Sequence, residues 1–323
     1  MSTINNKLIV ILGPTASGKS DLAVKIAKKY NGEVISADSR QVYKGMDIGS
    51  GKITKKEMQG VPHHLLDVAS PKKRFTVAQF QKLSWKKIRK IWKKGKLPIL
   101  CGGTGLYIQS IVDGLVIPEV PPDAKLRAKL EKLSTEELFK KLKKLDPRRA
   151  ENIDRYNRRR LIRALEIVIK TSQPVPAFKT GVELLLRGST PLEILQLGIT
   201  QPKEKLIKLI NRRLYKRLKQ GMVAEVKKLH SSGVSWKRLE EFGLEYRAIA
   251  LYLQNKIRTR SLCSQNLISL PRSERNKQKM IDNIQKESEQ YAKRQMTWFQ
   301  RDKRINWIKN YKETEKLVKN FLK

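Results

Sequence analysis

The sequence predicts an α/β protein in which helices flank a parallel β-sheet, with a helical insertion domain and a helical C-terminal region. Three observations support this prediction. Short apolar runs typical of buried strands alternate with longer stretches in which apolar residues recur every three or four positions. The first run, Leu8–Leu12, leads through a glycine-rich turn straight into a helical pattern. Three prolines, Pro118, Pro121 and Pro122, then separate this part from a long helical stretch.

The turn after the first strand carries the motif on which this prediction rests most. It reads Gly13-Pro14-Thr15-Ala16-Ser17-Gly18-Lys19-Ser20, the pattern of a P-loop. In such loops, successive backbone N–H groups and the N-terminus of the next helix bind a diphosphate. Lys19 is placed to add a positive charge and Ser20 to hold Mg²⁺. A glycine turn without a ligand is the alternative, but the predicted strand, loop and helix together match the context of a P-loop. The sequence therefore predicts a P-loop NTPase-like sheet.

Two further strands are expected to end beside this loop. Glu33–Asp38 carries Asp38 at its C-terminal end, and Leu97–Cys101 leads into Gly102-Gly103-Thr104-Gly105. Ligands of open α/β sheets bind outside the carboxyl ends of the strands. We therefore expect Asp38 and Thr104 near the bound diphosphate, with the glycines allowing the backbone to approach a ligand. A purely structural turn is the alternative for the glycines.

The rest of the chain is predicted to be largely helical. Residues 1–117 form the first part of the core domain, 118–190 a helical insertion domain, and 191–323 the second part of the core with C-terminal helices. Within the insertion, Arg155–Ile169 carries Leu161 and Leu165 on one face and three arginines on the other. Leu192–Ile199 is expected to return to the sheet as a strand.

The C-terminal part begins with a basic helix over Lys203–Lys219. Residues 259–276 are polar and predict a loop or insertion. A last long helix is expected over Gln278–Asp302, where Lys293–Phe299 mixes basic and aromatic residues. That mixture suits phosphate contacts and base stacking. An aromatic core stripe with a solvated basic face is the alternative.

The charge of the chain points to a polyanionic partner. Its 323 residues include 70 Lys and Arg against 30 Asp and Glu, a formal net charge of +40. Such an excess is costly in self-repulsion, and nucleic acid is the simplest partner that offsets it. A lysine-rich composition with solvated faces is the alternative, although it explains clustered arginines less well.

The cysteine and hydropathy patterns exclude disulfide-rich, zinc-binding and membrane-spanning classes of protein. Cys101 and Cys263 make neither a disulfide framework nor a zinc pattern, and His63-His64 lacks metal-ligand spacing. No apolar run approaches the roughly 20 residues of a membrane span, and no signal-peptide pattern is present. We therefore expect a soluble, cytoplasmic protein without a membrane partner.

A kinase or ATPase acting on or with RNA is the default for a P-loop. Against it, the strand Leu97–Cys101 ends without the acidic residue that would hold Mg²⁺ in such enzymes. A non-catalytic RNA-binding protein with a vestigial loop is a further possibility. A transferase acting on free adenine nucleotides is disfavoured, because a small substrate needs no broad basic surface.

Several motifs in a fixed order add a resemblance. Beyond the P-loop they are Asp38–Tyr43, Gly45–Gly49, Pro62–Asp67, Gly102–Tyr107, Arg159–Glu166, Gly221–Val226 and Ala292–Trp298. Together they span residues 8 to about 304, and the chain resembles the tRNA dimethylallyltransferase family. One departure concerns Gly243-Leu244-Glu245-Tyr246-Arg247, because the family commonly has Gly-Tyr-Arg-Glu or Gly-Tyr-Arg-Gln in this region.

The resemblance implies an activity. A dimethylallyl group is transferred from dimethylallyl diphosphate to N6 of the adenosine that is 3′-adjacent to a tRNA anticodon, with release of diphosphate. The P-loop, Gly13 through Ser20, then holds the diphosphate of the prenyl donor, with Mg²⁺ on Ser20. The target base must leave its stack to reach the strand ends. The partners are the tRNA anticodon stem-loop and dimethylallyl diphosphate, and we expect a monomer.

The resemblance also implies roles for single residues. Asp38 is the base, Arg213 the catalytic arginine, and Thr104 lies beside the reacting centre. The implied tRNA contacts are Asp38, Ser39, Arg40, Gln41, Thr104, Arg127, Arg159, Arg160, Leu161, Ile162, Arg163, Lys293, Arg294 and Gln295.

Overall fold

The structure is a computed structural model that describes residues 6–118, 120–176, 192–257 and 271–323. The chain divides into two compact units, residues 1–112 with 186–323 (unit 1) and residues 113–185 (unit 2). Each unit has its own hydrophobic core.

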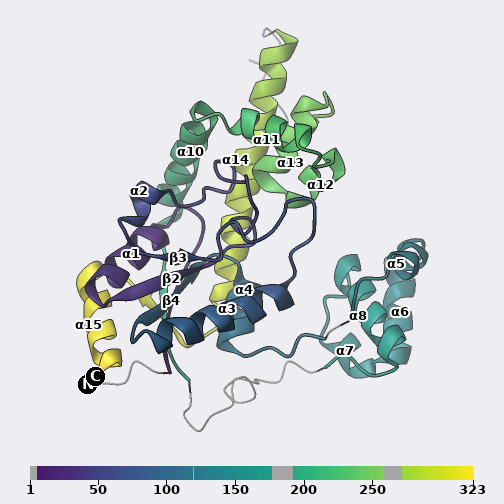
Figure 1. The fold of residues 1–323 in the computed structure, drawn as a ribbon. Helices are drawn as coiled ribbons and strands as arrows, with labels where there is room; N and C mark the ends of the chain where they lie inside the picture. Colours follow the sequence, from purple (N-terminus) through teal and green to yellow (C-terminus); the bar gives the residue numbers. More distant parts are fainter. Residues whose placement is uncertain (1–5, 119, 177–191, 258–270) are drawn as a thin grey trace. The chain divides into compact units, whose positions relative to one another are not determined.

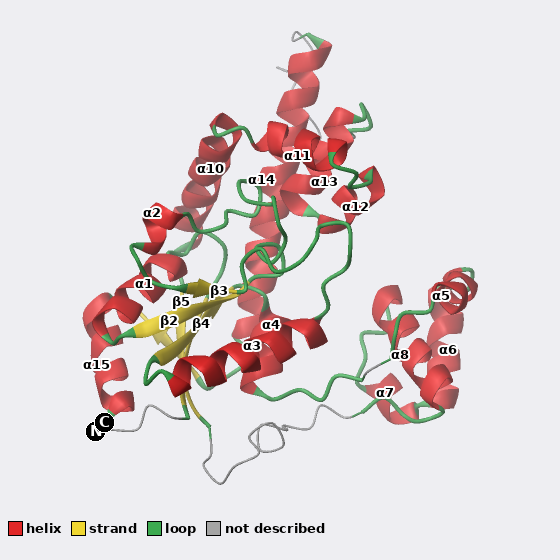
Figure 2. Cartoon of the chain, viewed as in Figure 1, coloured by secondary structure: helices red, strands yellow, loops and turns green. Residues whose placement is uncertain are grey.

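Unit 1 is built on a six-stranded parallel sheet with the order β3-β2-β4-β1-β5-β6 (Figure 2). Its strands are β1 (Lys7–Leu12), β2 (Gly32–Ala37), β3 (His63–His64), β4 (Leu97–Gly102), β5 (Glu193–Ile199) and β6 (Ile305–Ile308). The predicted α/β fold with a P-loop NTPase-like sheet is confirmed. The sequence did not predict β6, because it is four residues long and buries only its two end residues.

Helices cover both faces of the sheet (Figure 1). Those of unit 1 are α1 (Lys19–Lys29), α2 (Lys55–Met58), α3 (Val77–Lys93), α4 (Gly105–Val112), α10 (Lys203–Lys219), α11 (Met222–Ser231), α12 (Trp236–Phe242), α13 (Leu244–Leu253), α14 (Arg272–Phe299) and α15 (Tyr311–Leu322). Apolar residues of α1 and α15 share one core cluster with side chains of β1, β4 and β5. The helices α3 and α4 pack on each other, and α3 packs on β2 and β4.

Helix α14 is the longest element and differs from its prediction. It begins at Arg272, not near Gln278, and ends at Phe299. Residues 272–276, predicted as part of a loop, are therefore helical, whereas residues 259–270 of that prediction lie outside the described residues. Figure 1 shows α14 running from the group α10–α13 down past the sheet. It packs against α10, α13 and α4.

Unit 2 is a small helical domain of α5 (Ala124–Glu131), α6 (Thr135–Leu145), α7 (Pro147–Glu151) and α8 (Arg158–Thr171). Side-chain caps define its helix starts: Ser134 forms a capping box with Glu137, and Asp146 caps α7 just before Pro147. Leucines of α6 and α8 fill its core.

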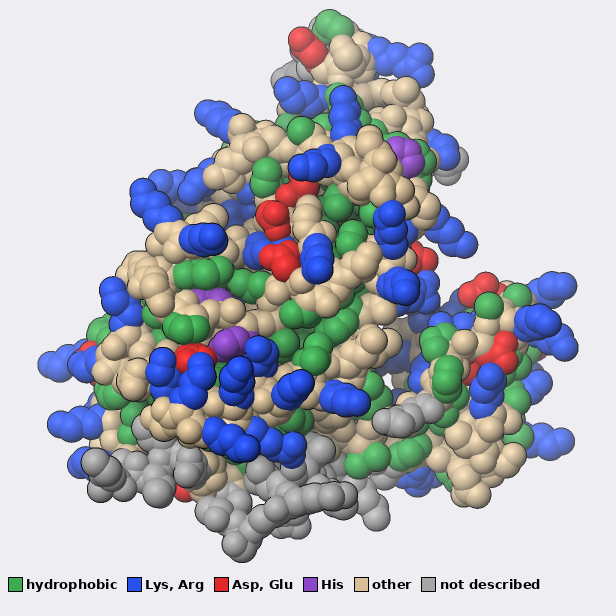
Figure 3. Space-filling view, in the orientation of Figure 1, with side chains coloured by type: hydrophobic (Ala, Val, Ile, Leu, Met, Phe, Trp, Pro, Cys, Tyr) green, Lys and Arg blue, Asp and Glu red, His purple; other side chains and the backbone are tan. Residues whose placement is uncertain are grey.

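Basic side chains are spread over the face shown in Figure 3, including the region of α3. On α3 the exposed ones are Lys82, Lys86, Arg89, Lys90 and Lys93. Among the described helices, none combines the length and hydropathy that a membrane crossing requires.

Candidate active site

The P-loop lies between β1 and α1, as the sequence predicts. Gly18 caps α1 with φ 92°, a conformation that favours glycine. Gly13 passes so close to β5 that an added Cβ would lie 2.4 Å from the Ile199 carbonyl oxygen. The buried Ser17 hydroxyl has no hydrogen-bond partner among the described residues. A buried polar atom normally has a partner, so this loop has the features of a site shaped for a polar ligand.

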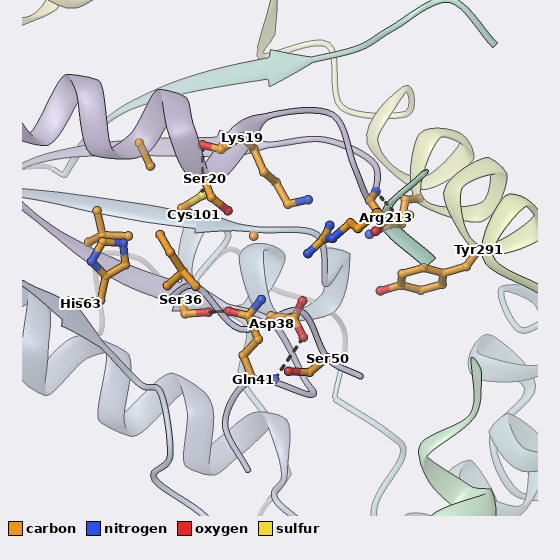
Figure 4. Close-up of a pocket in the computed structure, with 16 residues that line it drawn as sticks. Lys19, Ser20, Ser36, Asp38, Gln41, Ser50, His63, Cys101, Arg213 and Tyr291 are labelled. Carbon is orange, nitrogen blue, oxygen red and sulfur yellow. Dashed lines mark hydrogen bonds between the residues drawn. The ribbon is translucent and has the colours of Figure 1, made fainter. Parts of the chain in front are cut away.

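Lys19 lies at the first turn of α1 and points into the pocket next to the loop (Figure 4). Its Nζ donates to the Pro14 carbonyl at 3.0 Å. Burial lowers the pKa of Lys19, and the nearby negative charge of Asp38 opposes that shift. Cys101 lies behind Lys19, and burial raises the pKa of its thiol to about 12. Cys101 is therefore a neutral lining residue of the pocket.

Asp38 directly follows β2 and is held in a fixed orientation. Its Oδ1 accepts hydrogen bonds from the backbone N–H groups of Arg40 at 2.8 Å and Gln41 at 3.3 Å. Its Oδ2 has no hydrogen-bond partner within the part of the chain that the structure describes. One carboxylate oxygen is therefore fixed by the turn, and the other is available to a substrate proton.

Thr104 connects the end of β4 with the Asp38 turn. Its Oγ1 accepts from the Ser39 backbone N–H at 3.0 Å, and the Tyr291 hydroxyl of α14 lies near it. Burial raises the pKa of Tyr291 to about 12, and the negative charge of Asp38 acts in the same direction. Tyr291 therefore stays a neutral phenol at neutral pH. Its remoteness in sequence from both strand ends is why sequence reasoning missed it.

Arg213 reaches the site from α10 and donates to the Gly51 carbonyl at 3.1 Å. Burial lowers its pKa to about 10, and the like charge of Arg217 acts in the same direction. Arg217 in turn pairs with Glu245 at 3.0 Å. Gly51 has a φ of 59°, which favours glycine, and an added Cβ would lie 2.2 Å from Arg213 Nη2 and 1.6 Å from Arg217 Nη2, so both guanidinium groups would have to move. Two guanidinium groups thus approach one turn of backbone.

That turn is fixed from α11 and α13. Glu225 accepts hydrogen bonds from the backbone N–H groups of Asp47, Ile48 and Gly49, at 2.8, 2.6 and 3.0 Å. Tyr246 donates to Glu225 at 2.8 Å. Glu245, which lies in the segment that departs from the family pattern, is the partly buried partner of Arg217.

These groups converge on one pocket (Figure 4). Its polar lining includes Thr15, Lys19, Ser20, Asp38, Gln41, Arg213 and Tyr291. Ala23, Val34, Ile53 and Cys101 give it an apolar part. In Figure 4, Lys19, Asp38, Arg213 and Tyr291 point from different elements toward a common space. Residues of the P-loop, Asp38 and Arg213 thus line one pocket, and Thr104 is joined to the Asp38 turn through Ser39.

Side chains of α14 occupy the space beside two glycines that follow β4. An added Cβ at Gly103 would lie 2.3 Å from Gln295 Nε2, and one at Gly105 would lie 2.4 Å from Trp298 Cδ1. At both positions the group that approaches the Cβ side of the glycine is therefore a side chain of α14. Phe299 is buried, so the aromatic core stripe describes this segment better than exposed stacking rings.

The residues predicted to contact tRNA fall into two groups. Arg159, Arg160, Lys293 and Arg294 are exposed. Leu161 and Ile162 are buried in the core of unit 2, and Gln295 is 6% exposed, so direct contact of these three side chains with RNA is contradicted. Their positions on amphipathic helices explain the difference, because a contiguous motif samples both the solvent face and the core face.

Arg127 and Arg163 have internal roles. Both pair with Glu166 of α8, which is fully buried, through contacts of 2.6 and 2.5 Å. Burial alone would raise the pKa of Glu166, but hydrogen bonds led by that of Arg127 lower it to about 2. Arg40 likewise donates to the Phe242 carbonyl at 2.7 Å, and Gln41 to that of Gly51 at 3.2 Å.

Sheet order, glycine loop and the convergent charged groups define a P-loop α/β protein with a helical insertion. The family model described as IPP transferase matches residues 41–302, and the chain belongs to this family. The chain is 39% identical to the tRNA dimethylallyltransferase of Acetivibrio thermocellus, over 98% of this chain and 96% of that protein. It is also 39% identical to that of Carboxydothermus hydrogenoformans, over 98% and 97%.

Solved structures agree with this assignment. The full-length tRNA isopentenylpyrophosphate transferase from Bacillus halodurans superposes with a TM-score of 0.66 at 34% identity, covering 98% of this chain and 94% of that one. A eukaryotic dimethylallyltransferase acting on tRNA gives a TM-score of 0.69 at 27% identity, covering 91% and 70%. The resemblance inferred from the motifs is confirmed.

Proposed function

We propose that the protein is a tRNA prenyltransferase. It transfers a dimethylallyl group from dimethylallyl diphosphate to N6 of the adenosine 3′-adjacent to the anticodon and releases diphosphate. The observation that carries this proposal is the convergence of a diphosphate-type loop, two cations and one oriented carboxylate on a single pocket. A kinase or ATPase is not favoured, since the relatives are transferases of a prenyl group.

The diphosphate is bound by the P-loop. Backbone N–H groups of the loop, the Ser17 hydroxyl, Lys19 and Arg213 surround the leaving group, which gains negative charge as the C1–O bond breaks. Preorganised donors that meet developing charge in a secluded site lower the barrier. The apolar residues of the pocket, Ala23 and Val34 among them, suit the five-carbon chain.

Asp38 acts as the base. N6 of the adenine attacks C1, the C1–O bond electrons leave with the diphosphate, and the N6 proton passes to Oδ2 of Asp38. An exocyclic amine is a weak nucleophile, so removal of its proton by a positioned group assists attack. Two backbone N–H groups hold Oδ1 and so aim Oδ2. Thr104 fixes the same turn through Ser39, and Gln41 lies on it beside the extruded base.

Mg²⁺ fits the chemistry of this site. In the described residues, no group of three or more His, Cys, Asp or Glu side chains could hold a metal, but Mg²⁺ typically binds through few protein ligands and substrate phosphates. The Ser20 hydroxyl, at the first turn of α1, would be its protein ligand. When bound there, the ion would neutralise charge on the diphosphate.

The tRNA is bound by exposed cations, Arg159, Arg160, Lys293 and Arg294, and by the Asp38–Gln41 turn at the pocket. Phosphate contacts of this kind position an RNA without reading its sequence. The net charge of +40 supplies the long-range attraction. We further propose that the enzyme works as a monomer in the cytoplasm.

One assay tests the proposal. The protein is incubated with unmodified tRNA, dimethylallyl diphosphate and Mg²⁺, and the digested nucleosides are weighed. Adenosine that has gained one five-carbon unit is the expected product, located at the position after the anticodon by fragment mapping. Release of phosphate from ATP without that product would instead favour a kinase or ATPase.

A further inference from the structure

Gln295 is a buried polar side chain on the inner face of α14. It is 6% exposed, and its two neighbours Lys293 and Arg294 are exposed. Its amide makes two hydrogen bonds to backbone groups far away in the sequence. Oε1 accepts from the Thr15 N–H at 2.9 Å, and Nε2 donates to the Gly103 carbonyl at 2.8 Å.

The two partners of Gln295 belong to the two halves of the reaction site. Thr15 is the third residue of the P-loop. The orientation of its N–H group is therefore part of the conformation in which the loop binds a diphosphate. Gly103 precedes Thr104, which holds the Asp38 turn through Ser39. A single amide group therefore joins the diphosphate loop to the end of β4. It also attaches both to α14.

The pair of hydrogen bonds made by Gln295 requires an amide side chain. Because one partner is a donor and the other an acceptor, the side chain must accept with one atom and donate with the other, and both atoms must be bonded to the same carbon, as Oε1 and Nε2 are to Cδ. Gly103 gives Nε2 the room it needs, since even a Cβ there would approach within 2.3 Å. Buried backbone groups left without partners are costly, so loss of Gln295 would release both segments.

We propose that Gln295 is a positioning residue that holds the P-loop in its diphosphate-binding conformation. It acts on the donor side of the reaction and does not contact RNA, while its exposed neighbours on α14 face the tRNA. The proposal rests on the proposed function only for the identity of the prenyl donor. The binding of diphosphate by the loop does not depend on it.

Pyrophosphate with Mg²⁺ is the probe, because its binding needs no turnover. Gln295→Met preserves the length of the side chain but removes both hydrogen bonds. We expect it to weaken pyrophosphate binding in calorimetry about tenfold, the effect of losing a buried hydrogen-bonded pair, with tRNA affinity unchanged. Gln290→Met is the matched control: Gln290 is exposed on the same helix, and its replacement should change neither affinity.

Gln295→Glu supplies a second test that a purely structural role would not pass. A protonated glutamic acid has the same shape as glutamine and can accept from Thr15 while donating to Gly103. The ionised form has no donor and repels the Gly103 carbonyl. Burial raises the pKa of such a carboxyl, so we expect the ratio of variant to wild-type pyrophosphate affinity to rise about tenfold as the pH falls from 8.5 to 6. The ionisation of pyrophosphate cancels in that ratio.

Two results would overturn the proposal. One is weaker tRNA binding in Gln295→Met with normal pyrophosphate affinity, and the other is a pH-independent ratio for Gln295→Glu. If the Met variant does not fold, the Glu ratio decides. If the wild-type protein fails to prenylate tRNA, the proposed function falls, but the pyrophosphate measurements still judge Gln295.

Discussion

Asp38 shows how one residue acquires a reactive geometry from its surroundings. Its Oδ1 is engaged by the N–H groups of Arg40 and Gln41, and the turn that carries them is tied to β4 by Thr104. The carboxylate needs neither a long side chain nor a charged partner to be aimed. Its contribution should therefore be chemical and separable from folding.

Asp38→Asn tests this separation. The amide oxygen still accepts from Arg40 and Gln41, but the side chain no longer takes a proton. We expect kcat to fall about 10²- to 10⁴-fold, the usual contribution of a positioned base, with tRNA affinity unchanged in filter binding. Asp154→Asn is the matched control, because Asp154 accepts an equivalent hydrogen bond from the N–H two residues later but lies in unit 2. Wild-type turnover by Asp38→Asn would refute the role of base.

Glu33 is a buried carboxylate, and it stabilises the start of β2. It is 1% exposed and contacts Lys94 at 2.9 Å, Lys96 at 3.2 Å and His64 at 2.7 Å. Burial alone would raise its pKa, but these hydrogen bonds, led by that of Lys94, lower it to about 2. Since the folded pKa lies below the unfolded value, the stabilisation is present above about pH 4.5 and is lost as the pH falls toward 2.

Glu33→Gln should therefore lower the free energy of unfolding at pH 7 by about 2 kcal/mol, the scale of a charged hydrogen bond. Urea titrations at pH 7 and at pH 3 provide the measurement. The difference between variant and wild type should shrink at pH 3, because protonation removes the advantage of the native carboxylate. A difference that is equal at both pH values would argue against ionic stabilisation by Glu33.

At the scale of elements, β1, β2, β4 and β5 could be predicted because each is a short apolar run buried along most of its length. The P-loop, Asp38 and Thr104 followed from their positions at strand ends. Tyr291 and Gln295 could not be placed, because the packing of α14 on the sheet brings together segments almost 200 residues or more apart. The glycines after β4 carried a signal of close approach, but not the identity of the approaching group.

Gly103→Ala tests that packing. The new methyl group would lie 2.3 Å from Gln295 Nε2, so the Gln295 side chain must leave its hydrogen bonds, or α14 or the strand end must shift. We expect destabilisation of about 1–3 kcal/mol, as for other overpacked sites, together with weaker pyrophosphate binding. Urea denaturation of Gly103→Ala, Gln295→Ala and the double variant measures the coupling. Removal of the Gln295 side chain should relieve the clash, so the two costs should be clearly less than additive, whereas strictly additive costs would contradict the contact.

At the scale of the whole molecule, the charge excess predicted a polyanionic partner, but it did not say which cations bind it. The described residues fall into cations that form internal ion pairs and cations that are exposed. Arg127 and Arg163 neutralise the buried Glu166 of unit 2, whereas Arg159 and Arg160 of the same motif are exposed. The exposed lysines along α3 fit a solvated basic face as well as they fit a contact with a polyanion. Charge composition therefore predicts the class of partner, and only burial and pairing distinguish structural cations from candidate contacts.

Arg160→Ala distinguishes a phosphate contact from a bystander charge. Each phosphate contact releases counterions, so the logarithm of tRNA affinity falls with the logarithm of salt concentration in proportion to the number of contacts. We expect Arg160→Ala to weaken binding and to reduce that slope by about 1, as measured by filter binding from 50 to 300 mM KCl. Lys140→Ala is the control within unit 2, because Lys140 is exposed and paired with Glu136 at 3.1 Å, and its slope should equal that of wild type. An unchanged slope for Arg160→Ala would mean that Arg160 makes no phosphate contact, and the remaining exposed cations would have to account for tRNA binding.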